Sequence, residues 1–235
     1  MTYNTGTVRV DPRAFGWSLG SRHGKEDHVQ GRYHREITIE ALGDHFSPAA
    51  LREVIQANLR LDGLFGQIGH DEYHFDQNAF SQSREFVERN RARVGPALEA
   101  GDAHTARRCL GRLTHTVQDF YAHSNYVSLW LRQFEGHELP GPEAIDALDA
   151  TLLDSPELRS GRLYLPLEVL SFIPGIRNWV LPHLPPDSHA WMNLDGPERE
   201  PLFSYARTAA KQRTRVEFAH TLQDLPAELV TRLCT

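Results

Sequence analysis

A long stretch of helical periodicity, from about Ala103 to Phe134, constrains the fold of this 235-residue chain more than any other feature. Its apolar residues recur at intervals of three and four positions, as in a helix that buries one side against protein. These residues are Leu110, Leu113, Val117, Phe120, Tyr121, Val127 and Leu131. We expect this helix to form the centre of the fold.

Shorter helical patterns flank this stretch on both sides. One begins near His34, a second starts at Ser47-Pro48, and others cover about 79–93, Pro142–Leu153 and Leu202–Leu233. Patterns of alternating apolar and polar residues, which favour strands, are scarce. The sequence therefore predicts an all-α fold, a single compact multi-helix domain over residues 31–235 with a metal cluster at its centre. Residues 1–30 show little periodicity and are predicted to form an N-terminal arm.

Charge and hydropathy exclude some partners. The net charge is -6 with histidines neutral, so the chain lacks the basic surface that drives binding to duplex nucleic acid. The sequence contains no uncharged apolar stretch long enough to predict a transmembrane helix. The N-terminal residues lack the apolar core of a signal peptide, so we expect a cytoplasmic protein or one exported by an unconventional route. Cys109 and Cys234 are predicted to be unrelated free thiols.

Three potential metal ligands lie on one face of the central helix. His115, Asp119 and His123 are spaced four residues apart, so their side chains project along one line, about 6 Å from one to the next. Two neighbouring side chains of this set can bind one ion, or the carboxylate of Asp119 can bridge two ions. The alternatives are a solvated polar stripe, or a metal-free helical bundle in which histidines fill polar core positions.

Other segments supply matching ligand types. The segments Asn58–Asp62 and His70–Asp76, near glycines that allow the backbone to turn, supply carboxylates and imidazoles, and one Asp with one His from them would complete a four-ligand set with His115 and Asp119. His34 opens the first helical pattern and could supply another ligand. Farther along the chain, His189 and Asp195 lie beside large apolar residues. Together these residues predict a centre assembled from distant parts of the chain.

The segment from Leu113 to Tyr126, Leu-Thr-His-Thr-Val-Gln-Asp-Phe-Tyr-Ala-His-Ser-Asn-Tyr, resembles the signature of the fungal HET-C proteins and their bacterial relatives. These proteins are grouped with zinc-dependent phospholipases C in the phospholipase C and single-strand nuclease superfamily. Supporting segments follow in the same order: His34-Arg-Glu-Ile-Thr38, Asn58 with Asp62, His74-Phe75-Asp76, and His189 with Asn193-Leu-Asp195. The resemblance covers residues 34 to about 220.

The resemblance implies two or three zinc ions in a helical domain. It assigns Asp62, His74, His115 and Asp119 to one ion, and His34 with a bridging Asp119 to a second. A third ion is assigned to His123, His189 and Asp195. Imidazole-rich ligand sets favour zinc over magnesium.

These inferences predict a hydrolase, a zinc-dependent phospholipase C that cleaves phosphodiesters of phospholipid headgroups with metal-activated water. Asp62 is the predicted catalytic residue, which orients or deprotonates that water. The alternatives are a single-strand nuclease, or a HET-C-like recognition or toxin module without catalysis. The expected partner is phospholipid or a membrane surface, because residues 163–184 are strongly apolar, although core packing explains this stretch equally well. The oligomeric state is not predicted.

Overall fold

The computed structural model describes residues 29–63, 66, 69–171 and 175–235. Within these ranges every regular element is a helix, and the extended pairings are two isolated bridges, Ser124 with Ser160 and Arg162 with Ser188. The predicted all-α class and multi-helix domain are confirmed. Residues 1–28 of the predicted arm lie outside the described residues.

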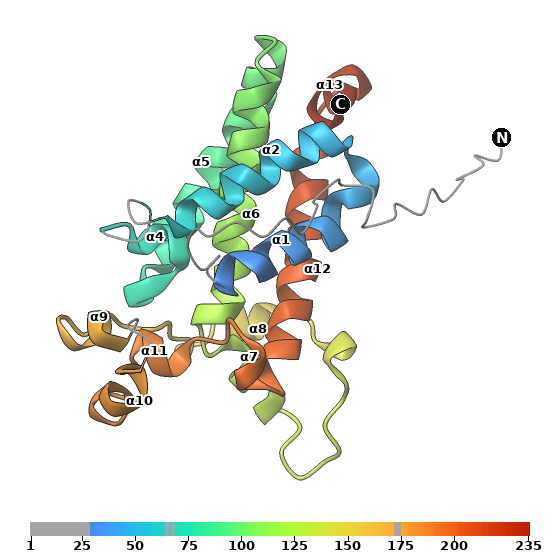
Figure 1. Cartoon of the computed structure of the whole chain (residues 1–235). Helices are drawn as coiled ribbons and strands as arrows, with labels where there is room; N and C mark the ends of the chain where they lie inside the picture. The colour runs from blue at the N-terminus through green and yellow to red at the C-terminus, as the bar shows by residue number, and fades with distance from the viewer. Residues whose placement is uncertain (1–28, 64–65, 67–68, 172–174) are drawn as a thin grey trace, which may run out of the picture.

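Helix α6, Ala103–His123, runs through the middle of the molecule (Figure 1). It begins at Asp102, whose side chain accepts a hydrogen bond from the Thr105 amide at 2.9 Å and so satisfies one of the free amides of the first turn. The helix packs against α5 (Phe80–Glu99), α2 (Pro48–Leu59) and α12 (Leu202–Leu222). Because it is enclosed by helices, its polar side chains face protein rather than solvent.

The remaining long elements complete the bundle. Helix α1 (Val29–Leu42) packs against α12 and α2, and α13 (Ala227–Cys234) packs against α5 and α6. Helix α2 starts where the sequence predicts, because Ser47 caps it through the Ala50 amide at 3.3 Å. The short helices η2 (Gly43–His45) and η3 (Arg60–Asp62) follow α1 and α2 respectively.

Two apolar clusters lie at different levels along α6. Residues 106–117 of α6 contribute to one, with α2, α5 and α13, and Phe120 and Tyr121 contribute to the other, with α7 and α12. The line formed by His115, Asp119 and His123 therefore crosses from one apolar cluster to the other, which makes a shielded polar layer.

The central helix ends earlier than predicted, at His123 rather than Phe134. Ser124 is extended, and its hydroxyl donates to the Phe120 carbonyl, while the Asn125 amide bonds to the Arg159 carbonyl at 3.0 Å. Short polar side chains at this point compete with helical hydrogen bonds. A separate helix, α7 (Tyr126–Arg132), follows.

Other predicted bounds also differ. The predicted C-terminal helix is two helices, α12 and α13, with Pro226 between them. The helix predicted around 142–153 is only a 3-10 turn, η5 (Pro142–Ala144), followed by a single helical turn, α8 (Ala150–Leu153). The polar helix predicted over 79–93 extends to Glu99. The remaining short elements are α4 (Asp71–His74), η4 (Asp76–Asn78), α11 (His189–Met192) and η7 (Pro197–Arg199).

The apolar stretch 163–184 is broken, as its prolines predict, into α9 (Leu167–Ser171), α10 (Arg177–Val180) and η6 (Leu181–His183). Leu165 and Trp179 are exposed, whereas Leu170 and Leu181 pack against buried Val180 and Leu184. Phe172 and Ile173, which belong to the apolar stretch that suggested a lipid partner, lie outside the described residues. Among the described helices, none combines the length and apolarity needed to cross a bilayer.

Candidate metal centre

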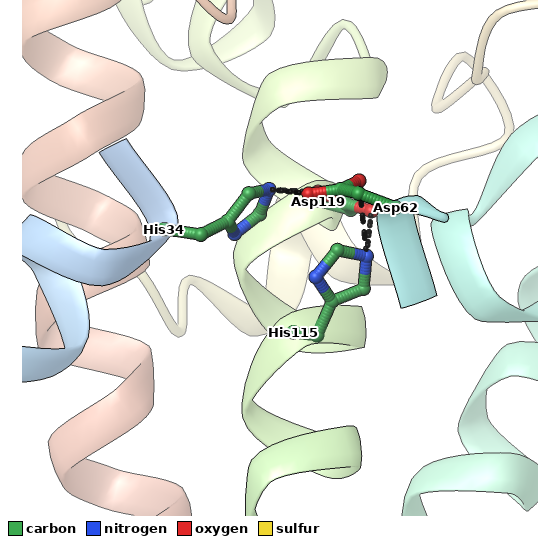
Figure 2. Close-up of side chains that lie close together, drawn as sticks. All are labelled: His34, Asp62, His115 and Asp119. Atoms are coloured by element: carbon green, nitrogen blue, oxygen red, sulfur yellow. Dashed lines mark ion pairs between the residues drawn. The ribbon is translucent and has the colours of Figure 1, made fainter. Parts of the chain in front are cut away.

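Three separate elements bring four of the predicted ligands together (Figure 2). His34 comes from α1, Asp62 from η3, and His115 and Asp119 from adjacent turns of α6. Gly111 permits this approach, because a Cβ atom there would lie 2.3 Å from the Val54 carbonyl oxygen of α2. The close packing of α2 on α6 carries Asp62 to the face of α6 that holds the two ligands.

The distances in this first centre match those of a coordinated ion. His34 Nε2 lies 2.9 Å from Asp119 Oδ1, and His115 Nε2 lies 3.0 Å from Asp119 Oδ2. Asp62 is 3.6 Å from His115 Nε2 and 3.9 Å from His34 Nε2. Ligands at about 2.0–2.1 Å from a tetrahedral zinc ion are separated by about 3.3 Å, which falls within this range.

The carboxylates at the first centre lack the hydrogen bonds that buried oxygens normally have. Among the described residues, the buried oxygens Asp62 Oδ2 and Asp119 Oδ1 receive no hydrogen bond of good geometry. The nearest donor to both is His34 Nε2, which lies 2.9 Å from Asp119 Oδ1 and 3.9 Å from Asp62 Oδ2 and can donate only when the ring carries a proton on that nitrogen. Leaving a buried carboxylate oxygen without a donor is costly. A cation between the carboxylates and the rings removes this cost, so the donor set fits a bound metal ion.

The surrounding amides fix which ring nitrogens face the centre. Gln118 Oε1 lies 2.7 Å from His34 Nδ1, and Gln118 Nε2 donates to Thr38 and Thr214 at 3.1 and 3.2 Å. The Gln118 oxygen must therefore accept a hydrogen bond from His34 Nδ1, which in the neutral ring leaves the lone pair on Nε2. Asn58 Oδ1 lies 3.4 Å from His115 Nδ1 and favours the same tautomer there. Outer partners of this kind orient imidazole ligands in metal sites.

His74 lies next to the four-residue group. Its Nδ1 is 2.7 Å from Asp119 Oδ2 and 3.2 Å from His115 Nε2, while its Nε2 is 3.2 Å from the Gly66 carbonyl. All five residues predicted for the first two ions, His34, Asp62, His74, His115 and Asp119, thus meet in one place. Asp62 is the least buried of them, with 15% of its side chain exposed.

Charge stabilises the ion-free centre. Burial alone lowers the pKa of His34, but the negative charges of Asp119 and Asp62, together with the polar contacts to Asp119 and Gln118, outweigh burial and raise the pKa to about 10. Burial opposes ionisation of Asp119, yet the neighbouring His115, His34 and His123 hold its pKa well below the usual range. Burial lowers the pKa of His115, which favours the neutral ring that a metal needs.

The three residues predicted to bind a third ion, His123, His189 and Asp195, do not all converge on one point. His123 Nε2 lies 3.3 Å from Asp195 Oδ2, whereas its Nδ1 faces Asp76 Oδ1 at 3.4 Å. His189 Nδ1 meets the same Asp76 oxygen at 2.9 Å. Asp76, His123 and His189 therefore form the second convergent group, with Asp195 behind His123.

The sequence-based ligand set omits Asp76. It follows His74 by two residues, but Phe75 and Gln77 have left-handed φ values of 58° and 56°, so no helical periodicity connects the two ligands. The signals in the sequence were composition, a carboxylate beside a predicted histidine ligand, and the place of Asp76 in the segment His74-Phe75-Asp76.

The fold and these sites define the class of protein as a helical domain with buried histidine–carboxylate groups suited to metal ions. Residues 28–144, just under half of the chain, match the family model described as the VWA7 N-terminal domain. The entire first centre lies within the matched segment, whereas His189 and Asp195 lie beyond it. This part of the chain is therefore similar to the VWA7 N-terminal domain.

The same resemblance is found in whole proteins. The chain is 34% identical over 127 residues to von Willebrand factor A domain-containing protein 7 of Homo sapiens, which covers 52% of this chain and 14% of the relative. The protein of the same name from Rattus norvegicus is 38% identical over 91 residues, 39% of this chain and 10% of the relative. The chain thus spans a small part of these relatives. No solved structure matches significantly.

These matches correct the family and activity predicted from the sequence. The chain resembles VWA7 proteins rather than HET-C proteins, phospholipases C or nucleases, and the matches give no support for a phosphodiesterase or other hydrolase. Ligands four residues apart on a central helix indicate metal chemistry but do not identify a family or a reaction. The catalytic role predicted for Asp62 loses its basis, and the predicted phospholipid partner is unsupported.

Proposed function

We propose that this chain is a zinc-binding helical domain of VWA7 type, in which an ion at the first centre stabilises the fold. His34, Asp62, His115 and Asp119 would hold the ion, with His74 as an adjacent donor. Two imidazoles with two carboxylates suit zinc better than magnesium or calcium, which prefer oxygen ligands.

One arrangement carries this proposal. Two buried carboxylate oxygens, Asp62 Oδ2 and Asp119 Oδ1, lack hydrogen bonds of good geometry and lie near the Nε2 atoms of the histidine rings. The Nδ1 atoms of His34 and His115 face the side-chain amide oxygens of Gln118 and Asn58. A network of neutral hydrogen bonds alone would not leave those carboxylate oxygens without donors. Four protein ligands satisfy a tetrahedral zinc ion, and such closed sites contribute directly to folding free energy.

The domain would use the ion to join α1, the end of α2 and α6. These elements supply ligands that are distant in sequence, so an ion that binds them all stabilises the folded arrangement and not the unfolded chain. In a longer protein of VWA7 type, this provides a rigid helical unit.

Elemental analysis of protein purified without a metal-binding tag tests the proposal. We expect bound zinc in the wild type and one zinc equivalent fewer in Asp119→Asn. This substitution removes the negative charge of the carboxylate that lies next to His34 Nε2 and His115 Nε2. Asp44→Asn is the matched control, because Asp44 is exposed in η2. Wild-type protein that neither retains zinc nor takes it up after dialysis would contradict the proposal, as would an Asp119→Asn variant with unchanged zinc content.

A further inference from the structure

A second group of metal-ligating side chains lies outside the first centre. Asp76 follows α4, His123 is the last residue of α6, and His189 is the first residue of α11; all three are buried. One ligand atom from each can be chosen so that all lie within 4.8 Å of one another. The group therefore satisfies the first geometric requirement for holding one ion.

The side chains converge through specific atoms. Asp76 Oδ1 lies 2.9 Å from His189 Nδ1 and 3.4 Å from His123 Nδ1, so one carboxylate oxygen faces two ring nitrogens of the same type. The two rings meet edge to face, with centroids 4.5 Å apart. His123 Nδ1 also lies 3.2 Å from the His74 carbonyl oxygen, and His189 Nε2 lies 3.4 Å from Asn193 Nδ2. An ion would take the place of the protons that the two Nδ1 atoms direct toward Asp76 and the His74 carbonyl.

Asp195 supports this arrangement from the other side of His123. Its Oδ2 lies 3.3 Å from His123 Nε2, the nitrogen opposite the one that faces Asp76. A carboxylate that accepts the outer proton of a histidine leaves the inner nitrogen free for a metal, as in carboxylate–histidine–zinc triads. Asp195 therefore acts as a positioning residue for His123, not as a ligand at the same nitrogen.

The backbone around the group is tightly constrained. Gly161 accepts a hydrogen bond from Gln77 at 2.8 Å and donates one to the His123 carbonyl at 2.9 Å. A Cβ atom on Gly161 would lie 2.6 Å from His189 Cα, so only glycine fits between the two ligand segments. The ligands are thus held in position by main-chain contacts, as a preorganised site requires.

Charge favours a divalent cation here. Because metal binding requires neutral rings, the metal-bound group would contain two uncompensated carboxylates, buried Asp76 and partly buried Asp195, with a total charge of -2. A divalent ion balances that charge, and two imidazoles with one carboxylate form a ligand set known for zinc and other transition metals.

From this geometry we propose that Asp76, His123 and His189 form a second metal site for zinc or a similar divalent transition-metal ion. Three protein ligands leave one position of a tetrahedral ion for water or an anion. The site also ties α11, and the α9–α10 segment packed near it, to the end of the central helix. It does not depend on an ion at the first centre, since the two ligand sets share no residue.

Metal stoichiometry separates the two sites. We expect two zinc equivalents in the wild type, and one in both Asp76→Asn and His189→Gln. His183→Gln, which changes an exposed histidine of η6, should retain two. One equivalent in the wild type that survives both substitutions but is lost in Asp119→Asn would overturn the second site and leave the first intact.

Titration of the metal-free wild type with cobalt(II) provides a second measurement that does not depend on the variants folding. We expect two equivalents to bind, with distinct changes in visible absorption as each site fills. Saturation at a single equivalent would overturn the proposal.

Discussion

Gln118 controls which nitrogen His34 offers to the first centre. Its side-chain oxygen lies 2.7 Å from His34 Nδ1, and two threonines hold its nitrogen. We predict that Gln118→Met lowers zinc affinity about 10–100-fold, the usual cost of losing an outer partner of a metal-bound histidine. Gln118→Glu keeps the acceptor and should bind nearly as tightly as the wild type. Competition with a chromophoric chelator measures both affinities, and an unchanged affinity in Gln118→Met would contradict the assignment.

The proton on His34 should make zinc binding at the proposed site dependent on pH. The pKa of His34 is raised from 6.5 to about 10 in the ion-free folded protein, so the ring holds its proton at neutral pH and must release it to bind zinc. Zinc affinity should therefore rise between pH 6 and pH 8. Calorimetry in two buffers of different ionisation enthalpy should detect the released proton; binding without proton release would contradict the prediction.

The raised pKa of His34 also makes the stability of the metal-free folded protein depend on pH. A folded-state pKa above the unfolded value stabilises the protein fully below pH 6.5, and this contribution is lost as the pH rises through about 10. Chelated protein should therefore become less stable from neutral pH toward pH 10.

At the scale of helices, the contact of α2 with α6 positions Asp62. A Cβ atom on Gly111 would lie 2.3 Å from the Val54 carbonyl oxygen and 2.7 Å from Ala57 Cβ. We predict that Gly111→Ala destabilises the domain by about 1–3 kcal/mol, because the helices must separate. Gly43→Ala is the matched control, since its nearest neighbour would lie 3.8 Å away. Urea unfolding measures both changes, and equal effects would show that the close approach is unimportant.

The sequence predicted those helices whose ends depend on local chemistry. Ser47-Pro48 starts α2 because a serine cap and a first-turn proline act within a few residues. The break after His123 was missed because apolar periodicity continues through Val127 and Leu131, while Ser124 and Asn125 bond to neighbouring and distant backbone groups. The position of Asp76 depends on left-handed residues that no periodic pattern reveals.

At the scale of the whole molecule, the sequence predicted which candidate ligands come together but led to the wrong family resemblance. Spacing along α6 brings His115 and Asp119 together by geometry alone, and the structure adds His34, Asp62 and His74 from other elements. A helical fold with buried histidines and carboxylates is compatible with many functions, so a short motif did not determine the activity. The comparisons over residues 28–144 were needed to correct it.

The central claim is that the folded domain depends on a bound zinc ion. Thermal unfolding of the wild type after removal of metal, followed by addition of zinc, tests it most directly. Free zinc at about 1,000 times its dissociation constant adds about 4 kcal/mol to stability. For a domain of this size that corresponds to a rise of about 10 °C in Tm. We predict this rise with zinc and not with magnesium; an identical Tm with and without zinc would contradict the account.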